Sequence, residues 1–287
     1  MRGCGPKKLC PATERERMRL GYINYLNCYP LYYHMMKKST VPGVEIVPAY
    51  PSELNEMMRN RELDMSPISS AAYADIQGDV MILPDFCLAS VGYVRSVILI
   101  SRLPIEDLDQ KRIGLSNASQ TSVVLLRSLL RKYYGIGPKY QPTRPSPTLE
   151  SLDAALVIGN EAMMHSREAI PYVYDLGDLW FRKTGFPVVF ALFVVRKASV
   201  EKEPDAVNAV IRSYHVSLNC LKTDERETFL QSSKGEYPNI AYDIPTYFRL
   251  IKYEFTETLK QALRFYFSLA GEELGLLKTV GELEFME

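Results

Sequence analysis

Short apolar runs alternate with helical patterns along most of the chain. The runs typical of strands are Leu20–Asn24, Val44–Ala49, Val80–Leu83, Val94–Ser101, Arg112–Leu115, Ala154–Gly159, Tyr172–Asp175 and Val188–Arg196. Several are almost continuous Val, Ile and Leu, as in a sheet that is buried on both faces. Between them, the apolar spacing predicts helices at Leu31–Lys38, Ser52–Asn60, Ser69–Asp75 and Gln120–Tyr134. This alternation predicts an α/β fold with mostly parallel strands.

The pattern changes after Lys197. Pro204–Cys220 and Glu254–Leu269 predict long helices, with no convincing strand between them. We therefore expect a helical C-terminal part that packs back onto the first half of the chain. The proline-rich piece QPTRPSPTL, Gln141–Leu149, predicts a loop because its prolines lack N–H donors.

Two apolar runs indicate how the chain is divided into domains. VRSVILIS leaves one half of the chain, and VVFALFVVR returns to it. If both are hinge strands, residues 102–190 form a second α/β lobe that is inserted into a first lobe of 18–101 plus 191–287. A ligand then binds in the cleft, at the carboxyl ends of the strands. The folded pattern begins at Met18, so 1–17 are expected to be a disordered extension.

Composition and charge disfavour several function classes. The chain has 287 residues, 47% of them hydrophobic, which is enough for a large core. Lys+Arg and Asp+Glu are both 34, so no basic surplus favours nucleic acid or an anionic membrane as a partner. No apolar run approaches the roughly 18 residues of a membrane helix. The polar N-terminus lacks the apolar core of a secretory signal, so the expected location is cytoplasmic.

The common catalytic and metal-binding motifs are absent from the sequence. It contains no GxGxxG, GxxxxGK[ST], GxSxG or HExxH motif. The cysteines form no CxxC pair and their number is odd, which favours neither a disulfide framework nor a zinc site; they are Cys4, Cys10, Cys28, Cys87 and Cys220. The histidines lack metal-ligand spacing, so structural or surface roles are expected for His34, His165 and His215.

Small hydroxyl and amide residues recur where a predicted strand gives way to a helix. They are Ser69 and Ser70 in MSPISSAAY, Ser119, Thr121 and Ser122 in LSNASQTSVVLL, and Asn160 in VIGNEAMM. One interpretation is helix capping, worth roughly 1 kcal/mol each. The other is an anion site, because free N–H groups and the positive end of the helix dipole bind carboxylates. Several such clusters around one cleft favour an anionic ligand, and two carboxylates would suit them.

Asn27 raises the same alternatives in GYINYLNCYPLYY, Gly21–Tyr33. Its amide is placed either to cap the helix that follows or to donate and accept at the cleft floor, and the spacing favours neither. The neighbouring tyrosines are expected in the core and at the cleft rim rather than in a ring-stacking site; they are Tyr25, Tyr29, Tyr32 and Tyr33.

The order and spacing of several segments resemble one enzyme family. These segments are GYINYLNCYPLYY, ELDMSPISS, LPDFCLASVGYVRSVILIS, IGLSNASQTSVVLLRSLL, LVIGNEAM and YDLGDLWFRKTGFPVVFALFVVR. Together they resemble the chorismate dehydratases of the futalosine route to menaquinone. The resemblance covers about Leu20–Arg196, and it implies a bilobed type II periplasmic-binding-protein-like fold.

The resemblance also implies a reaction and roles for individual residues. Chorismate would lose water to give 3-[(1-carboxyvinyl)oxy]benzoate, with the substrate's enolpyruvyl carboxylate as base and no cofactor or metal. The family's motif asparagine falls on Asn27 and its hinge serine falls on Ser96, which become the expected catalytic residues. The expected substrate-binding residues are Ser69, Ser70, Ser119, Thr121, Ser122, Asn160 and Thr184.

One segment departs from the family pattern, and other functions remain open. Members often read Asp-Gly-Pro where this chain has Val91-Gly92-Tyr93, so Tyr93 predicts a different cleft rim. One alternative is the sister enzyme that releases 1,4-dihydroxy-6-naphthoate, whose Ser-Pro-Cys-Pro-Asn-Asp motif is replaced here by NYLNCYP. Another is a non-catalytic cytoplasmic protein that binds a dicarboxylic metabolite. The chain is expected to be a monomer or a homodimer.

Overall fold

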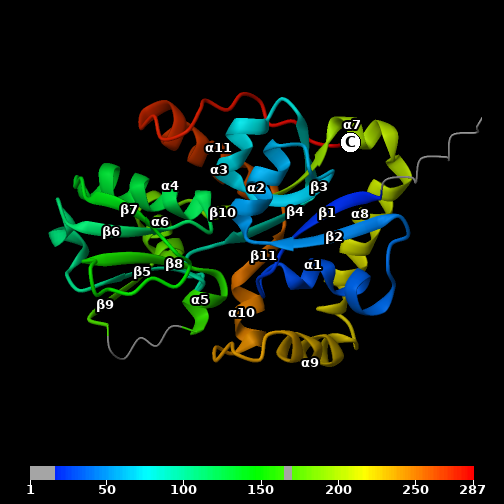
Figure 1. The fold of residues 1–287 in the computed structure, drawn as a ribbon, viewed down its shortest axis with the longest axis horizontal. Helices are drawn as coiled ribbons and strands as arrows, with labels where there is room; N and C mark the ends of the chain where they lie inside the picture. Colours follow the sequence, from blue (N-terminus) through cyan, green and yellow to red (C-terminus); the bar gives the residue numbers. More distant parts are fainter. Residues whose placement is uncertain (1–16, 165–169) are drawn as a thin grey trace, which may run out of the picture.

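The computed structural model describes residues 17–164 and 170–287, and its strands form two separate sheets that lie side by side (Figure 1). In spatial order, the first sheet contains β11 (Ile251–Glu254), β4 (Val80–Ser90), β10 (Val188–Arg196), β3 (Met65–Ser69), β1 (Met18–Ile23) and β2 (Val44–Ala49). The second sheet contains β7 (Lys139–Thr143), β6 (Arg112–Ser116), β8 (Ala154–Ile158), β5 (Val97–Ser101) and β9 (Tyr172–Asp175). The expected bilobed α/β architecture is confirmed.

Helices cover both sheets, and they dominate the C-terminal part as predicted (Figure 1). The α-helices are α1 (Tyr29–Tyr33), α2 (Pro51–Arg59), α3 (Ser70–Ile76), α4 (Gln120–Ser128), α5 (Gly159–Met164), α6 (Leu176–Thr184), α7 (Lys197–Lys202), α8 (Pro204–Cys220), α9 (Arg226–Glu236), α10 (Ile244–Leu250) and α11 (Glu257–Phe267). Three π-helical turns extend α1, α4 and α11, and one 3₁₀ turn follows β5; these are η1 (His34–Lys38), η3 (Leu129–Tyr134), η4 (Ser268–Glu273) and η2 (Ile105–Leu108).

Both sheets are mixed, so the prediction of mostly parallel strands is wrong. β1 runs parallel to β2 and β3, but β10 runs antiparallel to β3 and β4. The reason is the route of the chain. β10 returns from the second sheet and enters the first one beside the carboxyl end of β3, where Ala191 pairs with Ser69, so it must run in the opposite direction.

The apolar pattern located most strands but missed three. The bounds of β2, β9 and β10 are as predicted, whereas β3 is not among the predicted strands. The loop predicted over Gln141–Leu149 is wrong at its start, because β7 extends to Thr143. This strand lies at a sheet edge, where Pro142 need not donate to a neighbour. β11 was also missed, since four residues carry little pattern of their own and it forms by pairing with β4.

Sheet membership bears on the predicted lobes, 18–101 plus 191–287 and 102–190. β10 lies in the first sheet, but β5 pairs with β8 and β9 in the second. We therefore propose that the second lobe starts at Val97 rather than at 102; the lobe boundaries remain a prediction. Of the predicted N-terminal extension, only Arg17 belongs to the described residues.

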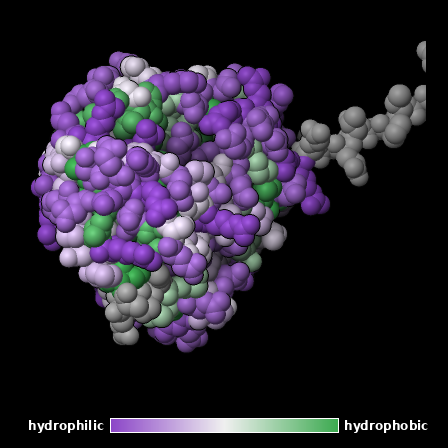
Figure 2. All heavy atoms as spheres, turned by 60° about the vertical axis from the view of Figure 1, so that its left-hand side comes forward, coloured by the Kyte–Doolittle hydropathy of each residue, from purple (hydrophilic) through white to green (hydrophobic). Residues whose placement is uncertain are grey.

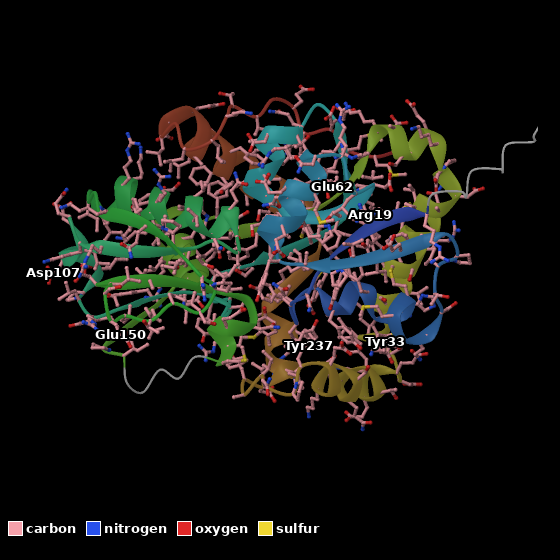
Figure 3. The ribbon with its side chains drawn as sticks, in the orientation of Figure 1. Arg19, Tyr33, Glu62, Asp107, Glu150 and Tyr237 are labelled. Atoms are coloured by element: carbon pink, nitrogen blue, oxygen red, sulfur yellow. The ribbon has the colours of Figure 1, made fainter. Side chains whose placement is uncertain are left out.

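An aromatic layer joins α1 to the C-terminal helices. The ring centroid of Tyr29 lies 5.8 Å from that of Tyr237 and 5.9 Å from that of Phe229. Tyr33 and Tyr237 both lie between α1 and α9 (Figure 3). Tyr29, Tyr32 and Tyr33 are buried, which confirms that they belong to the core. The layer fixes α1, and therefore the turn before it, against the rest of the first lobe.

The outer surface is mainly hydrophilic on the face that Figure 2 shows, with hydrophobic residues in small separate patches. Within the described ranges, no helix has the length and apolarity needed to cross a bilayer.

Candidate active site between the sheets

A cavity of about 50 Å³ lies between the two sheets and is partly open to solvent. Residues from both lobes line it: Ile23, Tyr25, Asn27, Pro51, Ser69, Leu88, Val94, Ser96, Val97, Ser119, Ser122, Ile158, Gly159, Phe190, Ala191 and Ile251. Several of these follow the carboxyl ends of β1, β3, β6 and β8, which is where α/β folds bind ligands. Among these lining residues none carries a formal charge, so its polar groups are neutral hydroxyls and amides.

A larger hollow of about 510 Å³ lies on the other side of Ile251, near β11, α8 and α11. Its lining is mainly apolar. Among its charged residues, Lys222 pairs with Glu254 at 2.5 Å and Lys252 donates to the Arg249 carbonyl at 3.1 Å. The smaller cavity is the better candidate site because polar groups from several elements converge there.

Asn27 lies in the turn between β1 and α1, and it does not cap the helix. The N-cap residue of α1 is Cys28, without a side-chain capping bond, so the capping interpretation of Asn27 is wrong. The Asn27 Oδ1 atom is buried and has no hydrogen-bond partner among the described residues. A buried amide oxygen without a hydrogen-bond partner destabilises the fold. Its position at the wall of the cavity therefore points to a ligand that donates a hydrogen bond to it.

Ser96 opens the hinge strand, and a tyrosine from the C-terminal part binds it. The Tyr247 hydroxyl on α10 donates to Ser96 Oγ at 2.8 Å. Burial raises the pKa of Tyr247, while its hydrogen bonds with Ser96 and Asn27 lower it in part. Sequence reasoning missed Tyr247. Asp243 and Thr246 signal the helix start, but nothing local shows that this helix returns to the hinge.

The backbone around Ser96 is held in an unusual conformation. Arg95 has a positive φ of 70°, which non-glycine residues rarely adopt. The Asp175 carboxylate accepts hydrogen bonds from the backbone N–H groups of Val94 and Arg95, at 2.7 Å from the latter. Burial raises the pKa of Asp175, and these backbone bonds oppose the rise. The carboxylate thus fixes the direction in which the Ser96 side chain leaves the hinge.

Three of the predicted hydroxyls meet at the N-terminus of α4 and line the cavity. Ser119 is the N-cap residue, and its Oγ accepts from the Ser122 backbone N–H at 3.4 Å. Ser69 reaches the same place from the other lobe, where its Oγ accepts from the Gln120 N–H at 3.3 Å. Each hydroxyl that accepts in this way keeps a proton to donate, and the helix dipole adds positive potential. This cluster suits one carboxylate group.

The other four predicted substrate-binding residues do not line the cavity. The Ser70 hydroxyl donates to the Val189 carbonyl at 2.7 Å, and Thr121 donates to the Phe190 carbonyl at 2.9 Å. Asn160 Oδ1 accepts from the Leu26 N–H at 2.9 Å, a bond that joins the two lobes. Thr184 donates to the Trp180 carbonyl at 2.8 Å, within its own helix. We therefore propose structural roles for these four residues.

The edge of the cavity is formed by Tyr25 and a glycine from the opposite lobe. Gly159 has a φ of +64°, and a Cβ atom on it would lie 2.4 Å from the Tyr25 ring. Only glycine therefore fits at this position. Burial and then the nearby Glu161 carboxylate raise the pKa of Tyr25. The Tyr50 hydroxyl also reaches Glu161, at 3.4 Å. Tyr93, expected at the rim, does not line the cavity.

The histidines and cysteines lie elsewhere. His34 Nδ1 is 2.9 Å from Ser213 Oγ, and His215 Nε2 is 3.2 Å from Asp85 on the surface. Their expected structural and surface roles are confirmed. The thiols of Cys28, Cys87 and Cys220 are free and buried. Within 17–164 and 170–287, no group of His, Cys, Asp or Glu side chains could hold a metal ion. His165, Cys4 and Cys10 lie outside the described residues.

Comparison with known proteins gives a consistent result. A family model described as menaquinone biosynthesis matches residues 18–272. The chain is 32% identical to a chorismate dehydratase of Thermus thermophilus over 195 residues, which are 62% of this chain and 69% of the relative. It is 24% identical to a 1,4-dihydroxy-6-naphtoate synthase of the same organism over 200 residues, or 69% of this chain and 72% of the relative.

Solved structures share the architecture at lower identity. The crystal structure of protein AF1704 from Archaeoglobus fulgidus aligns with a TM-score of 0.73 and 20% identity, over 91% of this chain and 99% of that one. The periplasmic aliphatic sulphonate binding protein SsuA of Escherichia coli aligns with a TM-score of 0.61 and 14% identity, over 95% and 94%. These identities support a shared fold and nothing further.

Proposed function

Because the chain belongs to the menaquinone-biosynthesis family and has the bilobed periplasmic-binding-protein-like fold, we propose that it is an enzyme that dehydrates chorismate. The product is 3-[(1-carboxyvinyl)oxy]benzoate, and the reaction class is that of a carbon–oxygen lyase. The observation that carries the proposal is the pair of Asn27 and Ser96 at a cavity with neutral hydrogen-bonding groups. The two residues at which the family resemblance places catalysis lie at one cavity.

The polar groups of the lining suit this substrate, and the two lobes must move apart to admit it, because a cavity of about 50 Å³ is smaller than chorismate. Chorismate carries two carboxylates and one ring hydroxyl. Ser69, Ser119 and Ser122 at the N-terminus of α4 offer donors for one carboxylate. Asn27 and Ser96 lie elsewhere on the lining, where they can reach the leaving hydroxyl. Because the lining residues are neutral, the charges at the occupied site are those of the substrate's two carboxylates.

The chemistry requires little more than positioning. Removal of the ring C3 proton gives an extended enolate. The C4 hydroxyl then leaves and takes up the same proton from the base, so that one water is lost and the ring becomes aromatic. In the family resemblance the base is the substrate's own enolpyruvyl carboxylate, and no lining residue here supplies another carboxylate or an imidazole. The chain's task is then to hold the carboxylate near C3 and to stabilise the leaving hydroxyl. Asn27 and Ser96 take the second role.

The two alternative functions, the sister enzyme and a non-catalytic binding protein, fit the observations less well. The 1,4-dihydroxy-6-naphtoate synthase is the more distant of the two Thermus relatives, at 24% against 32% identity. Its usual N-terminal motif is also absent, since β1 runs into NYLNCYP. A non-catalytic binder is disfavoured by the match to a biosynthesis family and by the similarity to a chorismate dehydratase, which is an enzyme. A cytoplasmic location and a monomeric or homodimeric state stay predictions.

The turnover of chorismate is expected to be constant from about pH 6 to about pH 9. The ionisable residue among those described on the lining is Tyr25, whose pKa is raised by burial and then by Glu161, so it stays protonated throughout. Both substrate carboxylates are ionised above about pH 5. Initial rates in overlapping buffers measure this. A sigmoidal rise with a midpoint inside the range would point to a base supplied by the protein.

The direct test is incubation of the purified chain with chorismate alone. Loss of one water and the ultraviolet spectrum of an aromatic enolpyruvyl benzoate are expected. The matched control is heat-denatured protein, which measures spontaneous breakdown of chorismate. Unchanged chorismate from a chain with a cooperative thermal transition would reject the proposal and favour the sister enzyme or a binding protein.

A further inference from the structure

The buried hydroxyl of Tyr247 connects the two proposed catalytic side chains. It donates to Ser96 Oγ at 2.8 Å, and the Asn27 side chain is also hydrogen-bonded to it. We propose that Tyr247 is a positioning residue that makes Ser96 a donor and Asn27 an acceptor toward the substrate. This inference rests on the proposed function and deepens it.

The direction of hydrogen bonding at Ser96 follows from the number of protons that the two hydroxyls carry. A phenol has one proton, and Tyr247 gives it to Ser96 Oγ. Burial raises the pKa of Tyr247, so this proton stays in place at the pH of the reaction. Since Ser96 Oγ accepts from Tyr247, its own proton must be donated elsewhere. Ser96 lines the cavity, so the substrate is the partner within reach.

Toward a ligand, Asn27 has the opposite role to Ser96: it accepts a hydrogen bond. The hydrogen bond between Asn27 and Tyr247 does not use Oδ1, because this atom has no partner among the described residues, so the amide N–H donates to the phenol oxygen. The NH₂ end of Asn27 is therefore directed at Tyr247. The other end, Oδ1, is buried without a partner among the described residues. Asn27 thus meets a ligand as an acceptor.

The donor role of Ser96 and the acceptor role of Asn27 both suit a hydroxyl that leaves as water. In the bound state, a substrate O–H donates to Asn27 Oδ1 while its oxygen accepts from Ser96. As the carbon–oxygen bond breaks, negative charge grows on that oxygen, and the Ser96 proton is already directed at it. The hydrogen bond from Tyr247 to Ser96 Oγ strengthens Ser96 as a donor, because hydrogen bonds in a chain polarise one another.

The position of Tyr247 is set by its own helix. Asp243 caps α10 by accepting from the Thr246 N–H at 2.8 Å, which fixes the first turn where Tyr247 lies. The Tyr247 ring is fully buried and packs 6.2 Å from that of Phe248. The next element begins with Ile251, which lines the cavity. Helix α10 therefore holds the Tyr247 hydroxyl in a fixed position beside Ser96.

The test is Tyr247→Phe, which removes the hydroxyl and keeps the ring. We expect kcat for chorismate to fall about 10- to 100-fold, with KM changed less than about threefold, because the groups lose their orientation and the substrate keeps its carboxylate contacts. The control is Tyr253→Phe, which removes another buried hydroxyl, one without a hydrogen-bond partner among the described residues. It should leave kcat and KM unchanged.

A double variant separates positioning from general damage. If Tyr247 acts through Ser96, then Tyr247→Phe in a Ser96→Ala background should cost clearly less than in the wild type. Equal costs in both backgrounds, or an unchanged kcat in Tyr247→Phe alone, would overturn the inference.

A second readout does not depend on turnover. The side-chain amide resonances of Asn27, assigned by their loss in Asn27→Asp, should shift in Tyr247→Phe and stay in place in Tyr253→Phe. If the wild type leaves chorismate unchanged, the proposed function fails. The amide shift then decides separately whether Tyr247 directs Asn27, and its absence rejects the positioning role.

Discussion

The variant Asn27→Ala is expected to dehydrate chorismate about a hundredfold more slowly, because the leaving hydroxyl loses the acceptor that orients it. Its buried Oδ1 has no partner among the described residues, so the substrate hydroxyl is the group that would lose an acceptor. The amide also directs the Tyr247 hydroxyl, which raises the cost. Steady-state rates at saturating chorismate measure the effect, and KM should change less than kcat.

Thermal stability distinguishes this role from helix capping. Loss of a true N-cap costs about 1 kcal/mol, whereas α1 is capped by Cys28 and not by Asn27. Asn27→Ala should therefore unfold at or near the wild-type temperature. The control is Asn24→Ala, an exposed asparagine in the same turn that does not line the cavity. Full activity in Asn27→Ala would remove this residue from the mechanism.

Ser96→Ala is expected to lower kcat by about a hundredfold. The substitution removes the donor aimed at the leaving oxygen, and it also leaves the Tyr247 hydroxyl buried without its acceptor. The second effect should destabilise the fold by about 1–3 kcal/mol. Chemical denaturation measures the stability, and product formation measures the rate.

The matched control for this variant is Ser101→Ala. Ser101 is buried at the end of the same strand, and its hydroxyl donates to the Leu103 carbonyl at 2.7 Å. It should lose a comparable amount of stability and keep its activity, because it does not line the cavity. If both serine variants lose the same fraction of activity, the effect of Ser96→Ala comes from the fold and not from the site.

Capping residues show how far the sequence could predict the site. Ser119, Ser122 and Ser69 do line the cavity, whereas Ser70 and Thr121 donate to carbonyls of β10. All five stand where a strand ends and a helix begins. A hydroxyl at such a place is equally well satisfied by a ligand or by a neighbouring carbonyl. The choice depends on which backbone comes within reach, and this information is absent from local sequence.

The sequence by itself determined most of the strands, the long helices and the bilobed α/β class. Runs such as VVFALFVVR must be buried on both faces wherever they lie, because the hydrophobic effect acts on the side chains themselves. The direction of β10, the edge strands β7 and β11 and the partner of Ser96 were decided only by the tertiary structure. Tyr247 is 151 residues from Ser96 along the chain, and no periodic pattern extends over such a distance. Packing brings the two hydroxyls to 2.8 Å, and a hydrogen bond of that length depends on the whole fold.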